Sequence, residues 1–117
     1  MRSPTPTPSL VPAYDVTVYI VLDDFGESGR AYRETDEAEA DLETVITNLL
    51  TGQYRKPVRV VAFNTAEGWS RDVSEDIAWE VLKRTAKEGK SLASETRDFA
   101  VFHVGENETA LAESSLI

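Results

Sequence analysis

Two short segments carry apolar side chains for both faces of a strand, and they constrain the fold more than any other feature of the sequence. Residues 14–22 (YDVTVYIVL) place valine, isoleucine and leucine on one face and threonine, tyrosine and valine on the other. Residues 58–63 (VRVVAF), which follow Pro57, again supply side chains for both faces. Because such side chains need burial on both faces, both segments are predicted to be interior strands of one sheet.

The segment after the first strand begins with a turn and continues as an edge strand. Residues 23–30 (DDFGESGR) contain two glycines and no apolar periodicity, so they are predicted to reverse the chain. Residues 31–35 (AYRET) then return as a strand with a charged outer face, which is typical of a sheet edge. The two strands form a predicted hairpin.

A helix is predicted between the hairpin and the second interior strand. It starts at Asp36, with Glu39 at capping-box spacing, and ends at Gly52. Acidic residues crowd its first turns, where the helix dipole favours them. Its buried stripe follows the i, i+3, i+4, i+7, i+8 rule and consists of Leu42, Val45, Ile46, Leu49 and Leu50.

Helical patterns return in the second half of the chain. A second helix is predicted from near Asp72, where Asp72 and Glu75 have capping-box spacing, to Gly89. Residues 94–104 are predicted to form a third, shorter helix, although their pattern also permits a strand. The inward face of the second helix is expected to consist of Val73, Ile77, Ala78, Val81 and Leu82.

The resulting order β-β-α-β-α restricts the topology. A helix that returns from the edge strand delivers the next strand parallel to that edge strand and antiparallel to the first strand. We therefore expect an α+β fold: a small three-stranded, mainly antiparallel sheet of order 2-1-3 with two to three helices packed on it. Residues 13–105 are expected to form this single α/β domain.

Both ends of the chain are predicted to lie outside the domain. Residues 1–12 form a Pro/Thr-rich leader with four of the five prolines, each of which removes an amide donor, so the leader is expected to be disordered. Residues 106–117 (ENETALAESSLI) show neither clear periodicity nor caps and are expected to form a disordered tail.

Charge and composition exclude several classes of function. Lysine and arginine total 12 against 21 acidic residues, and the resulting net charge of −9 disfavours binding to nucleic acid and to anionic membranes. The absence of cysteine excludes disulfides and thiolate chemistry, and a single histidine, His103, excludes zinc sites with two imidazoles. No apolar run is long enough to span a bilayer or serve as a secretory signal, which predicts a cytoplasmic protein.

Three carboxylates, Asp23, Asp24 and Glu27, lie within five residues and could hold a hard cation such as magnesium. Acidic residues beside glycines also shape turns, and Arg55 or Lys56 could neutralise these ones. The second interpretation is favoured, so neither a metal site nor a cofactor is predicted.

The segment 64–72 (NTAEGWSRD) is the predicted binding site. It is expected to be a polar loop between a buried strand and a helix, where Arg71 offers a planar fork for carboxylate or phosphate and Trp69 an aromatic surface. A structural interpretation stands beside this one, because asparagine, threonine and glycine form turns and Trp69 can close the core. The candidate binding residues are Asn64, Thr65, Glu67, Trp69, Ser70 and Arg71.

The segments VRVVAFNTAEGWSRDVSEDIA, VLDDFG and GRAYRETDE resemble a family of small uncharacterised bacterial proteins. The resemblance covers residues 15–104 and neither tail. It implies a compact bacterial domain, and it supplies no activity, substrate or catalytic residue.

Three functions remain open. The favoured one is a non-enzymatic cytoplasmic interaction or regulatory module that binds a protein partner, or a second copy of itself, through the 64–72 loop or the open sheet edge. The second is a small metabolite-binding domain or enzyme that uses Glu67, Arg71 and the amides of the following helix, with a divalent cation at Asp23 and Asp24 as an option. The third is an acidic mimic of nucleic acid, with a surface formed by Asp36, Glu37, Glu39, Asp41 and Glu43.

Overall fold

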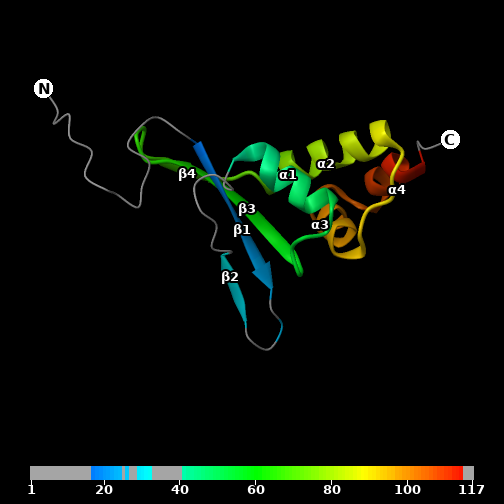
Figure 1. Ribbon diagram of the computed structural model, residues 1–117, viewed down its shortest axis with the longest axis horizontal. Coiled ribbons are helices and arrows are strands. Elements are labelled where there is room, and N and C mark those ends of the chain that lie inside the picture. Colours follow the sequence, from blue (N-terminus) through cyan, green and yellow to red (C-terminus); the bar gives the residue numbers. More distant parts are fainter. Residues whose placement is uncertain (1–16, 25, 27–28, 33–40, 115–117) are drawn as a thin grey trace, which may run out of the picture.

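A computed structural model describes residues 17–24, 26, 29–32 and 41–114 of the chain. These residues form a four-stranded antiparallel sheet with helices gathered on one side of it (Figure 1). The strands are β1 (Thr17–Asp24), β2 (Arg30–Tyr32), β3 (Pro57–Asn64) and β4 (Trp69–Asp72). The helices are α1 (Leu42–Leu50), α2 (Ser74–Glu88), α3 (Ser94–Val104) and α4 (Glu106–Ser114). The predicted α+β class is confirmed.

The strand order in the sheet is β2-β1-β3-β4, and every neighbouring pair is antiparallel. β1 therefore lies between β2 and β3, where both of its edges are paired. The sheet has one strand more than the sequence predicted, because residues 69–72 form β4 rather than part of a loop. Residues 33–35 of the predicted second strand lie outside the described residues.

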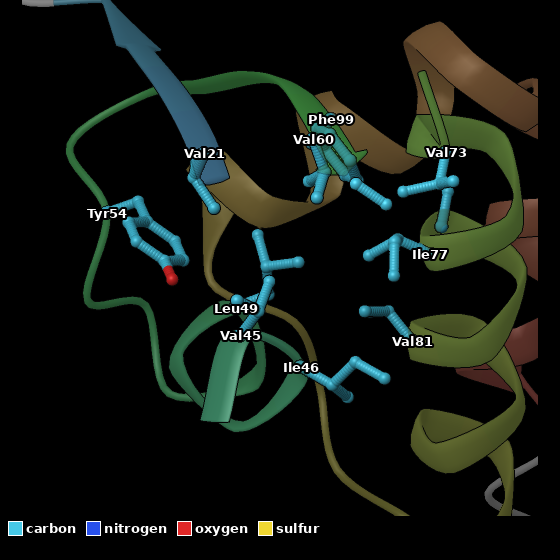
Figure 2. Packing of buried hydrophobic residues seen from close by; sticks show 12 residues of the cluster. Val21, Val45, Ile46, Leu49, Tyr54, Val60, Val73, Ile77, Val81 and Phe99 are labelled. Atoms are coloured by element: carbon cyan, nitrogen blue, oxygen red, sulfur yellow. The ribbon is translucent and has the colours of Figure 1, made fainter. Parts of the chain in front are cut away.

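The core lies between one face of the sheet and the helices. Figure 2 shows Val21 of β1 and Val60 of β3 directed toward side chains of α1 and α2. The predicted inward face of α2 is confirmed, since all five of its residues are buried. In the predicted stripe of α1, Val45, Ile46 and Leu49 are buried, whereas Leu42, the first helical residue, is 38% exposed.

The starts of two helices differ from the prediction. α1 begins at Leu42 with Asp41 in the N-cap position, while the predicted start at Asp36 lies outside the described residues. α2 begins at Ser74, because Asp72 belongs to β4 and its carboxylate accepts a 2.8 Å hydrogen bond from the Ser74 amide. The predicted end of α2 is confirmed, since Gly89 has the left-handed conformation (φ 71°) that glycine adopts readily.

The C-terminal region is helical. Residues 94–104 form α3, so the alternative of a strand is wrong. Residues 106–114 form α4, which corrects the prediction of a disordered tail from 106 onward. The helix has weak amphipathic character of its own, but Thr109 and Ala112 are buried and Arg97 of α3 binds both Glu106 and Glu113. These tertiary contacts stabilise a segment whose local pattern did not predict a helix.

The predicted leader, residues 1–12, lies outside the described residues, as do residues 115–117. Within the part of the chain that the structure describes, no helix is long and apolar enough to cross a membrane.

Candidate functional site

The predicted loop 64–72 is the tip and outer strand of a β-hairpin. β3 and β4 pair from Asn64 opposite Trp69 to Val61 opposite Asp72, and residues 65–68 connect them. The turn is closed by two 2.8 Å bonds, from the Gly68 amide to the Asn64 carbonyl and from the Glu67 amide to the Asn64 side-chain oxygen. Asn64 is buried, so its role is to shape the turn.

Three of the predicted binding residues form a small cluster on one side of this hairpin. The Trp69 indole N–H donates a 2.7 Å hydrogen bond to the Glu67 carboxylate, and the Arg71 guanidinium lies 5.9 Å from the centre of the indole ring. Trp69 is partly buried against the core, whereas Glu67 and Arg71 are exposed. Trp69 therefore closes the core, as the structural interpretation expects, and also holds two exposed charged groups in place.

The main chain of β4 presents hydrogen-bonding groups along the outer edge of the sheet. The Val73 amide donates a hydrogen bond to the Val60 carbonyl. In an antiparallel pair, the backbone groups of successive residues point alternately toward the partner strand and away from it. Arg71 and Trp69 consequently direct their amides and carbonyls toward β3, while those of Ser70 and Asp72 face outward. β4 is the last strand of the described sheet on this side.

Asp72 anchors this edge to α2. Its carboxylate accepts the Ser74 amide and forms an ion pair with Arg59 of β3. Burial raises the pKa of Asp72, but the hydrogen bonds from Ser74 and the neighbouring Arg59 guanidinium outweigh this effect and hold its pKa below the ordinary value. Asp72 thus places a negatively charged group at the start of α2, where it bonds the Ser74 amide.

The six predicted residues therefore lie on one hairpin but have different environments. Asn64 is buried, Trp69 is half-buried, and the exposed members are Thr65, Glu67, Ser70 and Arg71.

The sheet face turned away from the helices is apolar. Val18 lies opposite Phe63 and Ile20 opposite Val61 across the β1–β3 pair, and Leu22 continues the row on β1. These residues alternate with Tyr19, Val21 and Ala62, which belong to the helix-covered core. No described helix packs on this second face, which borders the side chains of Ser70 and Asp72 at the β4 edge.

Within the predicted carboxylate cluster, Asp23 and Asp24 bind different partners. The buried Asp23 carboxylate accepts the backbone amides of Arg55 (3.0 Å) and Lys56 (2.6 Å). The Asp24 carboxylate accepts a 2.8 Å hydrogen bond from the Gly26 amide and lies 3.6 Å from the Arg30 guanidinium. The hydrogen bond from Gly26 is the main cause of the lowered pKa of Asp24. Glu27 lies outside the described residues, among which no group of three acidic, histidine or cysteine residues is placed to hold a metal.

The acidic surface expected along the first helix is also partly neutralised. Glu43 accepts hydrogen bonds of 2.6 and 2.9 Å from Arg84 of α2, which lower its pKa. Asp41 occupies the N-cap position of α1. The other three acids, Asp36, Glu37 and Glu39, lie outside the described residues.

A cavity that the sequence did not predict lies at the other end of β3. It measures about 370 Å³ and lies between α3 and the adjoining ends of β1, β2 and β3. Its lining includes three cations, Arg30, Lys56 and Arg59, together with the aromatic rings of Phe99 and Phe102. These residues come from three separate segments of the chain. The sequence indicated one part of this arrangement, the proximity of the 23–30 turn to Arg55 and Lys56.

No protein-family model, curated protein or solved structure matches the chain. The resemblance to small bacterial proteins of unassigned activity therefore adds no residue role to either region.

Proposed function

We propose that the chain is a non-enzymatic, cytoplasmic protein-interaction module that binds an extended partner segment along β4. The observation that carries the proposal is the outward direction of the main-chain groups of Ser70 and Asp72 at the last strand of the described sheet. A partner strand can pair with these groups, and such pairing supplies affinity for many extended peptides.

Side chains on the two sides of β4 supply specificity. Arg71 and Glu67 project a cation and an anion beside the partly buried Trp69 on one side. Tryptophan and arginine are enriched at binding hot spots, and a preorganised pair loses little entropy when a partner binds. On the other side, Ser70 and Asp72 of β4 would lie next to alternate residues of the partner strand, and the apolar Phe63 and Val61 lie one strand further in.

The predicted 64–72 loop includes one edge of the sheet, because residues 69–72 form β4, while the edge strand predicted from residue 31 corresponds to β2 at the opposite edge. A second copy of the chain is one partner of this kind, since two β4 edges can pair antiparallel around a twofold axis. The chain's histidine, His103, lies on α3 with its Nε2 atom 2.8 Å from the Val58 carbonyl oxygen, away from the Ser70 hydroxyl. This separation favours binding over hydrolytic chemistry at the hairpin.

Selection of displayed linear peptides against the full chain tests the proposal, with the bound peptide located by changes in amide chemical shifts. The largest changes are expected at Ser70 and Asp72, and Arg71→Ala should weaken binding about fivefold or more. Lys83→Ala, on the exposed side of α2, is the matched control and should bind as the wild type does. Shift changes centred on α2 or α4, with β4 unaffected, would contradict the proposal. In the homodimer form, the same β4 amides shift with protein concentration alone.

A further inference from the structure

We infer that the cavity between α3 and the ends of β1 and β3 binds a small organic monoanion, a carboxylate carried on an aromatic or branched aliphatic body. The site lies at the start of β3, whereas the proposed interaction surface lies at its end and on β4. The inference is therefore independent of the proposed function.

The cations of the cavity provide its selectivity for an anion. Arg30, Lys56 and Arg59 line one cavity on a chain whose net charge is −9. Arg30 lies 3.6 Å from Asp24, and Arg59 is paired with Asp72. Lys56 forms no direct ion pair with a residue that the structure describes and acts on Asp24 only through the longer-range effect of its charge, so its ammonium group is the cation best placed to meet a ligand.

The backbone that presents Lys56 is held from two sides. Its amide donates to the buried Asp23 carboxylate at 2.6 Å, and its carbonyl accepts the Asp24 amide at 3.0 Å. The neighbouring Arg55 amide also donates to Asp23. Only the side chain of Lys56 has to become ordered when an anion binds, which reduces the entropy lost on binding.

The opposite wall of the cavity is aromatic and partly exposed. Phe99 is buried, whereas Phe102 is 76% exposed at the rim. His103 packs edge-on against both rings, and its Nε2 atom lies 2.8 Å from the Val58 carbonyl oxygen, which ties α3 to β3. A ligand with an apolar body would remove the Phe102 ring from water, and this burial is favourable at roughly 25 cal/mol per Å².

The size and charge of the site restrict the ligand. About 370 Å³ lies at the lower end of the range for small-molecule pockets, which suits one or two fused rings. Asp24 and Asp98 also line the cavity and repel additional negative charge. A single carboxylate on an apolar body fits these constraints better than a nucleotide or another polyphosphate.

Titration of the full ¹⁵N-labelled chain with indole-3-acetate, followed by amide chemical shifts, tests the inference. Indole-3-acetamide, which has the same body without the charge, is the matched ligand. Indole-3-acetate should shift the amides of Lys56, Val58, Arg59 and residues 98–102, and it should bind about tenfold more tightly than the amide analogue, as one charge-assisted hydrogen bond predicts.

Four variants separate this site from non-specific apolar binding. Lys56→Gln should weaken the acetate about tenfold and leave the acetamide unchanged, while Phe102→Ala should weaken both ligands. Lys83→Gln and Leu111→Ala, which alter the separate groove between α2 and α4, should affect neither ligand. Equal affinity for the two ligands, shifts confined to the α2–α4 groove, or no shifts at all would overturn the inference.

Discussion

The backbone amide of Lys56 donates a 2.6 Å hydrogen bond to the fully buried carboxylate of Asp23. The Arg55 amide donates to the second oxygen of the same carboxylate, so one side chain of β1 satisfies two amides of the segment that leads into β3. Buried polar groups are expensive to leave unpaired, and this carboxylate is therefore structural rather than a metal ligand.

Asp23→Asn is expected to lower the free energy of unfolding by about 2 kcal/mol, because an amide nitrogen would then face a backbone N–H. Urea unfolding followed by circular dichroism measures the loss. Asp24→Asn is the control and should cost less than half as much, since Asp24 is partly exposed and its carboxylate contacts the Gly26 amide and the exposed Arg30 side chain. Equal losses for the two variants would contradict the assigned role of Asp23.

Asp72 should make the junction of β4 and α2 sensitive to acid. Its folded-state pKa lies below the ordinary value of 3.8, so its stabilising effect is complete above that pH and is lost as the pH falls through the folded-state pKa. In Asp72→Asn, the melting temperature should fall less steeply below pH 3.8 than in the wild type. Arg59→Gln, which removes the charged partner, should reduce the steepness in the same direction. Parallel acid profiles for all three proteins would show that Asp72 does not contribute.

Arg97 should control the docking of α4. Arg97 donates a 2.9 Å hydrogen bond to Glu113 and also binds Glu106. The α4 sequence has only a weak apolar face that could hold the helix in place by burial. Arg97→Gln is expected to accelerate amide hydrogen exchange in α4 about two- to fivefold, the range that exposed ion pairs supply, with α2 unaffected. Arg84→Gln, which breaks a comparable network with Glu43 and Glu80, is the control and should leave α4 unchanged. Unchanged exchange in Arg97→Gln would contradict a role for this residue.

Much of the fold could be predicted because its strongest elements have local patterns. The inward face of α2, its end at Gly89 and the two interior strands follow from periodicity and from glycine chemistry. α4 could not be predicted in this way, because its stability depends on Arg97 and on burial of Thr109 and Ala112. Tertiary contacts outweigh local propensity in short helices.

The hairpin was misread although its signal was present. Gly68 (φ 73°) ends a four-residue connection between β3 and β4, and a left-handed glycine at that position is typical of hairpin loops. The segment 69–72 (WSRD) lacks the apolar alternation of a strand, so its sequence favoured a loop before the helix. The sequence predicted these six residues as one loop, whereas the structure places them on a hairpin in which Asn64 is buried and Trp69 half-buried.

The cavity near Lys56 could not be derived from the sequence, because its walls come from Asp24, Arg30, residues 56–59 and the α3 residues Asp98, Phe99 and Phe102. The packing of α3 against β3 brings these segments together. No local motif marks a site of this kind.

Binding to a Ser70→Pro variant is the most direct test of edge pairing at β4. Proline removes the outward Ser70 N–H, which the alternation leaves unused within the sheet, and edge strands tolerate proline at such positions. Ser70→Ala retains that N–H and is the matched control. Fluorescence anisotropy measures the binding of a labelled peptide that was selected on the wild type. The folded Ser70→Pro variant should bind this peptide at least tenfold more weakly, about the effect expected when one backbone hydrogen bond and its neighbours are lost. Ser70→Ala should bind it with wild-type affinity. Wild-type affinity in the folded Ser70→Pro variant would contradict binding along the β4 edge.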